Sequence, residues 1–469
     1  MKKRALAILL AILLAAMLLP ACANDTPDTP PVAGDEAAET QEETQEEAAP
    51  PTDIIEIGYA SWNGGEIQRD EEAWFEQYMI DNPHIRIVPQ FITGGDYWTV
   101  INTLFAAGEG PCVFFGAPPI SFTFDDRGLV HDLYPKFLEA GIDMFEVYLE
   151  STLGVTADGR VISLAHGLTT VLLYFNKDLF DELGVPYPSQ DYRNPMTWDE
   201  FRETARLLTR DSEGRTPDDP SFDSHNFSSF GVLAPVGMLW LEALLPSNNA
   251  GFLNVDAEHN ATSLALIEPE AREVLQAIAD LIFVDRVAPS AAIADALPGT
   301  VAMFQDNQLG MVISGGWLYS QYHAEGIDVG IAPLPMFREP VSLAWGASYM
   351  LSTQSPHPEE AFSFLKDFLN PELNPCLNKN MAPNMRSMYV GDALESWMDG
   401  LGDFFNDDYR KVIPNLIVNG INLEHLMYRD FEPIISNTAL PILDRLWLGE
   451  ADIDEVIAEI EAATVDFFR

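Results

Sequence analysis

The chain has few basic residues. Lysine and arginine number 25 against 73 aspartates and glutamates, which gives a formal net charge of −48 over 469 residues. A nucleic-acid partner needs a basic surface, so this balance excludes nucleic acid and argues against adhesion to anionic lipid or capture of an anionic ligand. The charge identifies no partner of its own, because a diffuse negative surface is in most proteins a solubility feature.

Cysteine is also scarce, with only Cys22, Cys112 and Cys376 in the whole chain. Positions 112 and 376 are too far apart to form a metal-binding motif, and we expect neither a metal nor a cofactor. These two thiols either pair in an oxidising exterior or remain as buried free thiols. The sequence also lacks HExxH, GxSxG and a glycine-rich phosphate loop, so no motif in it predicts an enzyme.

The N-terminus carries a basic start, a short apolar run and a cysteine. Basic residues 2–4 precede the apolar residues 5–19, a run with the length of a signal-peptide core that is too short for a comfortable membrane span. It ends in the tetrapeptide LPAC, which resembles the bacterial lipobox although Pro20 is unusual there. We therefore predict a lipoprotein signal peptide at 1–21 and lipidation of Cys22. An ordinary secretory signal with a chance cysteine is the alternative.

Residues 22–52 have a quite different composition. Positions 23–52 hold nine acidic residues and no basic one, with Val32 as the only large aliphatic side chain. Such a segment buries too little apolar surface to offset its ordering entropy, and its like charges and prolines keep it extended. We interpret 22–52 as an acidic disordered tether that holds a folded body away from the membrane. A processed pro-segment is the alternative.

The remaining body, 53–469, is long enough for two domains. Strands are predicted at 54–59, 85–88 and 113–116, separated by a helix at 71–79 and a second helix that Asp96 caps. This alternation predicts an α/β fold with a parallel sheet and crossover helices. Ligands of such sheets gather at the carboxyl ends of strands, and Trp62 and Asn63 follow the first strand.

Other features of the body are predicted from local patterns. A polar insertion at 212–229 is expected to be either a surface loop or a rim on a ligand cleft. The remaining predicted features are a helix at 267–283, a strand at 311–314, and helix caps at Thr197, Ser355 and Asp452.

Several short motifs occur in one order along the body. They are the aromatic and glycine loop at 62–65, NPHIRI at 82–87, the AG of 107–108 with Pro111, GLVHDL at 128–133, LYFNKDLFDEL at 173–183, MTWDEF at 196–201, MVISGGW at 311–317, APLP at 332–335, and the helical pattern at 352–368. In this order they resemble the family 1 extracellular solute-binding proteins, the group that includes maltose-binding protein. Cys112 departs from the pattern, because the family commonly has aspartate there.

The resemblance implies a two-lobed periplasmic-binding-protein-like fold of type II, in which each lobe is a sheet flanked by helices and a hinge joins the lobes. The chain would cross between lobes near 167–172 and 344–347. One lobe would combine 53–167 with 347–395, and the other 168–346 with 396–469. The ligand would lie between the lobes, which close around it.

A carbohydrate site needs aromatic platforms for the apolar faces of sugar rings and polar side chains for their hydroxyls. Trp317 is the first candidate, because the resemblance aligns it with the tryptophan of maltose-binding protein that stacks on sugar. Thr169 falls at the first crossing. Each candidate tryptophan could instead pack in the hydrophobic core and take no part in ligand binding. The other candidate ligand-binding residues are Trp62, Asn63, Trp98, Trp240, Tyr319, Trp345, Asn384 and Arg386.

The resemblance therefore implies an extracellular, lipid-anchored protein that delivers a ligand, expected to be an oligosaccharide or another carbohydrate, to an ABC transporter permease. It would act as a monomer on the extracytoplasmic face of the cell membrane, and it would bind by closure without chemistry. Two alternatives stay open. One is a surface lipoprotein sensor or adhesin with the same fold, and the other is a secreted carbohydrate-active hydrolase.

Overall fold

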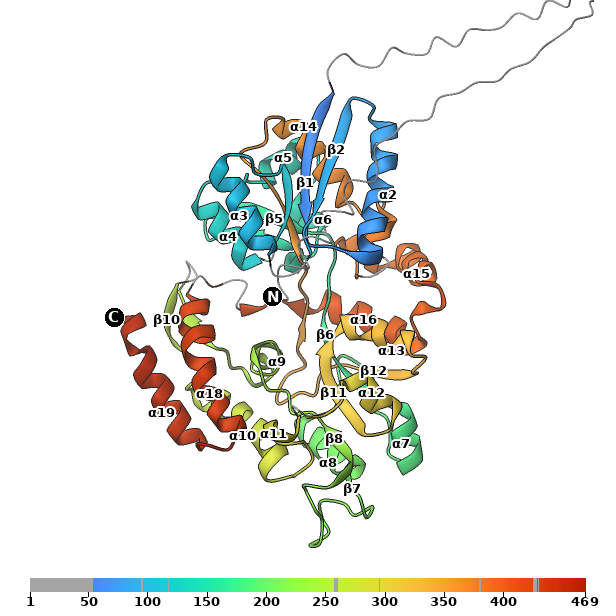
Figure 1. Cartoon of the computed structure of the whole chain (residues 1–469), viewed down its shortest axis with the longest axis vertical. Coiled ribbons are helices and arrows are strands. Elements are labelled where there is room, and N and C mark those ends of the chain that lie inside the picture. The colour runs from blue at the N-terminus through green and yellow to red at the C-terminus, as the bar shows by residue number, and fades with distance from the viewer. Residues whose placement is uncertain are drawn as a thin grey trace, which may run out of the picture. The chain divides into compact units, whose positions relative to one another are not determined.

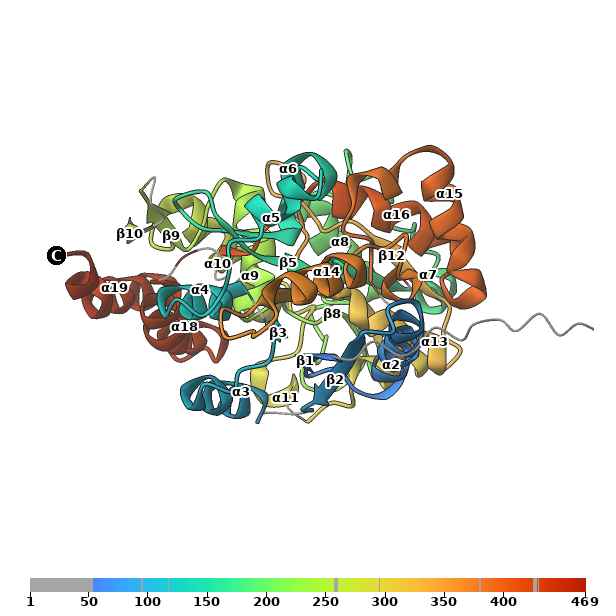
Figure 2. The ribbon, with the colours of Figure 1, turned by 90° about the horizontal axis from the view of Figure 1, so that it is seen from above.

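Two separate β-sheets organise the body of the chain in the computed structural model. The structure describes residues 54–93, 96–116, 118–256, 260–294, 296–378, 381–424, 428 and 430–469. The predicted signal peptide, Cys22 and the tether lie outside these residues. The mixed α/β architecture with two helix-flanked sheets confirms the predicted fold class, as Figures 1 and 2 show.

The first sheet has six strands in the order β2-β1-β3-β14-β5-β4. As predicted, its first three strands are parallel: β1 pairs with β2 and with β3 in the same direction. The complete sheet is mixed, because β14 runs antiparallel to both β3 and β5. The bounds are β1 Ile55–Ser61, β2 Ile85–Phe91, β3 Val113–Gly116, β4 Leu153–Val155, β5 Val161–Ala165 and β14 Ser348–Leu351.

The second sheet has five strands in the order β12-β6-β11-β8-β7. Two small two-stranded sheets accompany it, β9 with β10 and β13 with β15. The bounds are β6 Val171–Asn176, β7 Arg210–Asp211, β8 Phe227–Val232, β9 Leu253–Val255, β10 Ala261–Leu264, β11 Leu309–Gly315, β12 Val329–Ala332, β13 Ser342–Leu343 and β15 Gly420–Ile421.

Helices cover both sheets. In Figure 1 helix α2 stands beside β1 and β2, with α3 and α4 on the opposite side, while α18 and α19 lie side by side in both ribbon views. The bounds are α2 Gly65–Asp81, α3 Tyr97–Ala107, α4 Pro118–Asp126, α5 Tyr134–Glu139, α6 Met144–Val147, α7 Lys177–Leu183, α8 Trp198–Leu208, α9 Met238–Leu244, α10 Pro269–Phe283, α11 Ala291–Ala294, α12 Thr300–Gln305, α13 Tyr319–Ala324, α14 Pro358–Phe368, α15 Gly391–Gly400, α16 Asp407–Val418, α18 Leu440–Trp447 and α19 Ile453–Thr464.

Two of the predicted helix caps are confirmed. Thr197 Oγ1 accepts a hydrogen bond from the Glu200 amide at 3.2 Å, and the Glu200 carboxylate accepts one from the Thr197 amide at 2.8 Å. Asp452 and Glu455 form the same reciprocal pair at the start of α19. Each pair satisfies two amides that the first turn of a helix leaves without a partner.

The other two predicted residues make no capping bond. Asp96 has the predicted N-cap position of α3, but its backbone is helical, with φ −85° and ψ −10°, and its side chain accepts no bond from the first turn. Ser355 lies too early, because α14 begins at Pro358 and its N-cap residue is His357. The Ser355 hydroxyl instead accepts a bond from the His357 amide at 3.3 Å, which stabilises the bend before the helix. In addition, α2 begins at Gly65, six residues before the predicted start at 71.

Two of the segments in which the chain passes between the sheets pair with each other. Residues 166–170 connect β5 to β6, and 344–347 connect β13 to β14. The Thr169 amide donates to the Trp345 carbonyl at 2.8 Å, and the Trp345 amide donates back at 3.2 Å. A Cβ atom at Gly346 would lie 1.9 Å from the carbonyl oxygen of Gly167, so the close approach of the two segments requires glycine there.

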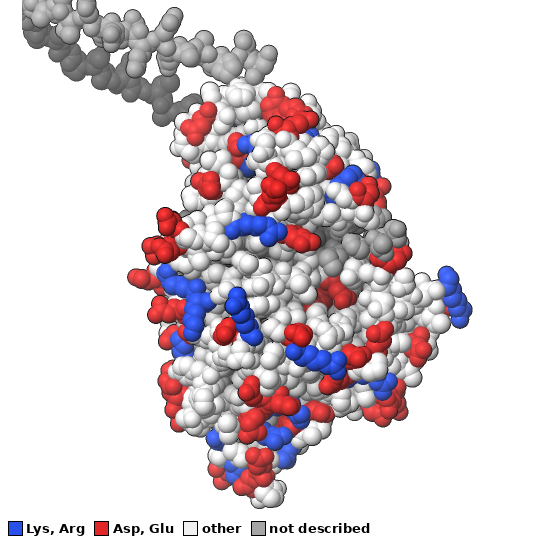
Figure 3. Space-filling model, turned by 180° about the vertical axis from the view of Figure 1, so that it is seen from behind, with Lys and Arg blue, Asp and Glu red and all other residues white. Residues whose placement is uncertain are grey.

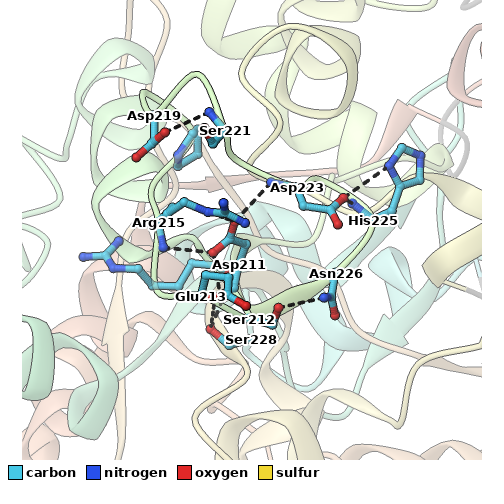
Figure 4. Close-up of polar contacts among 12 residues, drawn as sticks. Asp211, Ser212, Glu213, Arg215, Asp219, Ser221, Asp223, His225, Asn226 and Ser228 are labelled. Atoms are coloured by element: carbon cyan, nitrogen blue, oxygen red, sulfur yellow. Dashed lines mark hydrogen bonds and ion pairs between the residues drawn. The ribbon is translucent and has the colours of Figure 1, made fainter.

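The insertion predicted at 212–229 forms a surface loop over 212–226 at the edge of the second sheet, and its last three residues begin β8. It follows β7, the edge strand, which Figure 1 shows at the end of the body away from the first sheet. Figure 4 shows the loop folded around Asp211, whose buried carboxylate accepts bonds from the amides of Glu213, Arg215 and Asp223 and from Arg215 Nε. Of the two predicted possibilities, the structure has the surface loop.

The two cysteines of the body are both free thiols. Cys112 is buried, Cys376 is half-buried, and no disulfide joins them. In Figure 3 the acidic side chains are scattered over the visible face, with only a few basic ones between them, which agrees with a diffuse negative surface. In the part of the chain that the structure describes, no helix combines the length and the apolar character that a membrane span requires.

Candidate functional site

A cavity of about 630 Å³ lies between the elements that belong to the two sheets. One side is formed by the start of α2 and the other by the turn after β11, with the first crossing segment between them. The described lining residues are Gly64, Ile67, Leu168, Thr169, Thr170, Gly316, Trp317, Ser320, Met381, Phe404, Phe405, Tyr409, Ile413 and Ile417. A cavity of this size between two sheets is the usual place for a small-molecule ligand.

Trp317 is the most solvent-exposed of the aromatic side chains that line the cavity. It belongs to the short 3-10 turn Gly316–Leu318 directly after β11, and 48% of it is exposed. Its ring lies back over the strand end, because a Cβ atom at Gly315 would lie 2.0 Å from the indole. A half-exposed indole beside a cavity offers a flat apolar face to a ligand at little conformational cost.

Thr169 and Trp345 lie next to Trp317. The backbone pairing of the two crossing segments holds Thr169 at the cavity, and a Cβ atom at Gly316 would lie 3.2 Å from the Thr169 hydroxyl. Trp345 meets Trp317 edge to face, with ring centroids 6.1 Å apart, and packs against the core of the second sheet. The structure therefore brings three predicted residues together, with Thr169 and Trp317 lining the cavity.

Three predicted residues, Trp62, Asn63 and Trp98, belong to the first sheet's side of the molecule and do not line the cavity. Trp62 packs edge to face on Phe115 at 4.6 Å and on Trp98 at 5.6 Å, and both tryptophans are partly buried against the core of the first sheet. Asn63 is 8% exposed, and its amide nitrogen donates to Glu71 Oε1 at 2.7 Å. It therefore supports the loop whose next residue, Gly64, reaches the cavity.

Four other predicted site residues lie away from the cavity lining. Tyr319 is buried, and its hydroxyl accepts a bond from the Asn406 amide at 2.7 Å. Asn384 is fully buried and donates to the carbonyls of Ala165 and Leu369. Trp240 on α9 packs against the core of the second sheet, and Arg386 is exposed in the turn Arg386–Tyr389.

Sequence reasoning missed one apolar wall of the cavity. Tyr409, Ile413 and Ile417 recur every fourth residue of α16, so they share one face of the helix. Phe404 and Phe405 precede the helix and extend this face. The periodicity was visible in the sequence, but it does not distinguish a face that packs on a core from one that lines a cavity.

A second feature that no motif predicted is a buried polar cluster around Glu71. Glu71 lies one helical turn after Ile67 on α2 and is 4% exposed. Tyr59 donates to Glu71 Oε2 at 3.0 Å, Tyr349 donates to Oε1 at 3.2 Å, and the two tyrosine oxygens are 2.6 Å apart. If both phenols donate to an ionised Glu71, no proton is left for the contact between the two tyrosine oxygens. A protonated Glu71 that donates to Tyr59 frees the Tyr59 hydroxyl to donate to Tyr349, and all three contacts then carry a proton.

Burial supports the same conclusion about protonation. It raises the pKa of Glu71 from its ordinary 4.5 to about 7, against the opposing effect of the hydrogen bonds from Asn63, Tyr59 and Tyr349. Burial also lowers the pKa of His166, on the first crossing segment, to about 4, so this imidazole is neutral at physiological pH. His166 Nδ1 lies 3.0 Å from the Ala347 carbonyl and thereby links the two crossing segments.

The chain belongs to the bacterial extracellular solute-binding protein family, whose model matches residues 64–374. Members of this family and the similar structures are binding proteins of transporters. A maltotriose-binding protein of Pyrococcus abyssi is 21% identical over 411 residues, which cover 83% of this chain and 75% of that protein. The sn-glycerol-3-phosphate-binding periplasmic protein UgpB of Escherichia coli strain K12 is 27% identical over 151 residues, 31% of this chain and 33% of that protein.

Solved structures show the same fold. An ABC substrate-binding protein of Listeria monocytogenes in complex with cycloalternan matches with a TM-score of 0.70 and 21% identity, over 88% of this chain and 99% of that one. The sugar-binding protein MalE of Xanthomonas citri matches with a TM-score of 0.71 and 16% identity, over 88% and 97% of the two chains. These likenesses confirm the type II two-lobed fold that the sequence motifs predicted.

The raised pKa of Glu71 predicts a pH dependence of stability. Because the folded state binds this proton more tightly than the unfolded state, the contribution is fully present below pH 4.5 and is lost as the pH rises through about 7. The full difference amounts to about 3 kcal/mol. Glu71→Gln should therefore flatten the dependence of the unfolding free energy on pH, measured by chemical denaturation from pH 4.5 to pH 8.

The matched control is Glu76→Gln, at an exposed position on the same helix, and it should keep the wild-type dependence. If Glu71→Gln and the wild-type chain lose stability equally between pH 4.5 and pH 8, the protonated carboxyl is not present in the folded state.

Proposed function

We propose that the chain binds a carbohydrate in the cavity beside Trp317 and delivers it to the permease of an ABC transporter. The observation that carries this proposal is the half-exposed indole of Trp317, which lies against a cavity of about 630 Å³ beside the hydroxyl of Thr169. An aromatic face next to a polar group matches the apolar faces and hydroxyls of a sugar ring. The relatives whose names mention maltotriose and cycloalternan support the same ligand class.

We also propose that the ligand is enclosed by movement of two lobes. The lobes are 53–167 with 347–395 and 168–346 with 396–469, each built on one of the two sheets. The boundary at 395 falls inside α15, and a helix moves as a unit, so we place that boundary before Gly391. Binding then needs no chemistry, and the protein acts as a monomer.

The proposal extends to the anchor. Lipidation of Cys22 after removal of 1–21 would attach the body to the extracytoplasmic face of the cell membrane, with 22–52 as the tether. One acyl chain contributes about 0.8 kcal/mol per buried CH₂ and anchors only marginally, so stable attachment needs more than one chain. Bacterial lipoprotein modification supplies several.

A thermal-shift screen of the full chain against oligosaccharides tests the ligand class. A sugar at 100 times its dissociation constant stabilises the folded state by about 2.7 kcal/mol and raises Tm. Trp317→Ala should abolish this rise, because it removes the aromatic face. It should cost little stability in the absence of ligand, because the side chain is half exposed.

Trp74→Ala is the matched control. Trp74 packs on Tyr78 and Phe368 outside the cavity, so its loss should lower Tm but leave the shift caused by sugar intact. A shift with amino acids, polyamines or metal ions and none with sugars would overturn the carbohydrate proposal. Turnover of chromogenic glycosides would show a hydrolase instead of a binding protein.

The anchor has its own test. Expressed in a bacterium with lipoprotein processing, the wild-type chain should sediment with membranes and incorporate labelled fatty acid. Cys22→Ala should do neither and should appear in the soluble extracytoplasmic fraction, while Cys112→Ala, a buried thiol in the body, should behave like the wild type. Membrane attachment of the Cys22→Ala chain would refute the proposed lipidation.

A further inference from the structure

The cavity has one wall that is mostly apolar, in which the phenol of Tyr409 is the polar group. Helix α16 turns Tyr409, Ile413 and Ile417 toward the cavity, and Phe404 and Phe405 continue this face at the end nearer α13. Within this wall Phe405 stacks on Tyr409, with ring centroids 3.7 Å apart. Across the cavity, Ile67 at the start of α2 adds another apolar side chain, and 39% of it is exposed.

Few groups are available to bind sugar hydroxyls. Among the lining residues that the structure describes, no side chain is charged, and the aliphatic hydroxyls are those of Thr169, Thr170 and Ser320. The Thr170 hydroxyl already lies 3.2 Å from the Ser342 hydroxyl, and Ser320 donates to the Trp317 carbonyl at 3.0 Å. Thr169 is thus the aliphatic hydroxyl best placed for a ligand, and it lies beside the turn that carries Trp317.

An unsubstituted oligosaccharide fits these surroundings poorly. It carries several hydroxyls on every ring, and each one buried without a partner weakens binding by roughly tenfold or more. An apolar group against the α16 wall gains affinity instead, by about fourfold for each buried CH₂. The surroundings of Trp317 and the wall formed by α16 therefore favour two different kinds of chemistry.

We propose that the ligand is a glycoside with an apolar aglycone, an alkyl or aryl group. The sugar ring lies on Trp317 beside Thr169, and the aglycone lies against Phe404, Ile413 and Ile417. This inference rests on the proposed function, because it assigns the sugar part of the ligand to the same site.

Pairs of glycosides test the proposal. For a panel of mono- and disaccharides, the methyl and the hexyl glycoside of each sugar are titrated calorimetrically into the full chain, below the concentration at which the hexyl compound forms micelles. For the sugars that bind, the hexyl glycoside should bind at least tenfold more tightly than the methyl glycoside. Phenyl glycosides should show the same preference.

Two matched pairs of variants locate the effect. Phe404→Ser should reduce the hexyl-to-methyl affinity ratio to below threefold, while Phe145→Ser, a 41% exposed phenylalanine on α6 outside the cavity, should leave it unchanged. If Phe404→Ser fails to fold, Ile67→Ser provides the same test. Its control is Ile80→Ser on the same helix, at a position that is 71% exposed.

The outcomes separate this inference from the proposed function. Equal affinities for methyl and hexyl glycosides, together with binding of free sugars, would overturn the apolar aglycone and leave the carbohydrate site standing. A hexyl preference that survives both Phe404→Ser and Ile67→Ser would place the aglycone elsewhere and overturn the assigned wall. If neither glycosides nor free sugars bind, the carbohydrate site itself is wrong.

Discussion

The rest of the structure depends on the contact between two segments, 166–170 and 344–347, in which the chain crosses from one sheet to the other. Thr169 and Trp345 exchange backbone hydrogen bonds, and Gly346 lies so close to the Gly167 carbonyl that no side chain fits there. Buried backbone N–H and C=O groups need hydrogen-bond partners. The pairing provides partners for these groups of Thr169 and Trp345, and it also joins the two sheets. It also places Thr169 at the cavity and Trp345 beside Trp317.

The polar cluster around Glu71 stabilises the side of the cavity formed by α2. The Glu71 carboxyl accepts a hydrogen bond from the side-chain amide of Asn63, and Asn63 precedes Gly64 at the cavity edge. A buried carboxyl of the first sheet therefore supports a loop at the ligand site. The many acidic side chains are scattered over the face that Figure 3 shows. The acidic exterior keeps the protein soluble. The cavity lining, which has no charged side chain among the residues that the structure describes, is a separate surface.

The sequence predicted the α/β class, the parallel start of the first sheet and two capping boxes, because strand and helix periodicity and capping chemistry are local. Asp96 has the predicted N-cap position but makes no capping bond, because its backbone is already helical. The cap at Ser355 was wrong, since a capping residue type does not determine where the first turn begins. The motif at 311–317 predicted Trp317 beside a strand end, and the structure has it there. The burial of polar side chains could not be predicted in the same way. Asn384 and Tyr319 carry polar groups suited to a ligand, yet both form hydrogen bonds inside the protein.

The apolar wall was missed for a related reason. Tyr409, Ile413 and Ile417 have the spacing of a buried helix face, and only the tertiary arrangement shows that this face borders a cavity. The Glu71 cluster combines residues 59, 71 and 349, whose proximity depends on the antiparallel insertion of β14 into the first sheet. Contacts of this kind arise from topology and leave no local pattern in the sequence.

Hydrogen–deuterium exchange of the full chain, with and without a sugar that raises its Tm, tests most directly whether the ligand lies between the two sheets. Bound sugar should slow exchange at 64–70, 166–170, 315–320 and 404–417, which meet at the cavity, and should leave the surface loop at 212–226 unchanged. Slowed exchange that spares these four segments, or that is confined to the surface of one sheet, would contradict a ligand site between the sheets.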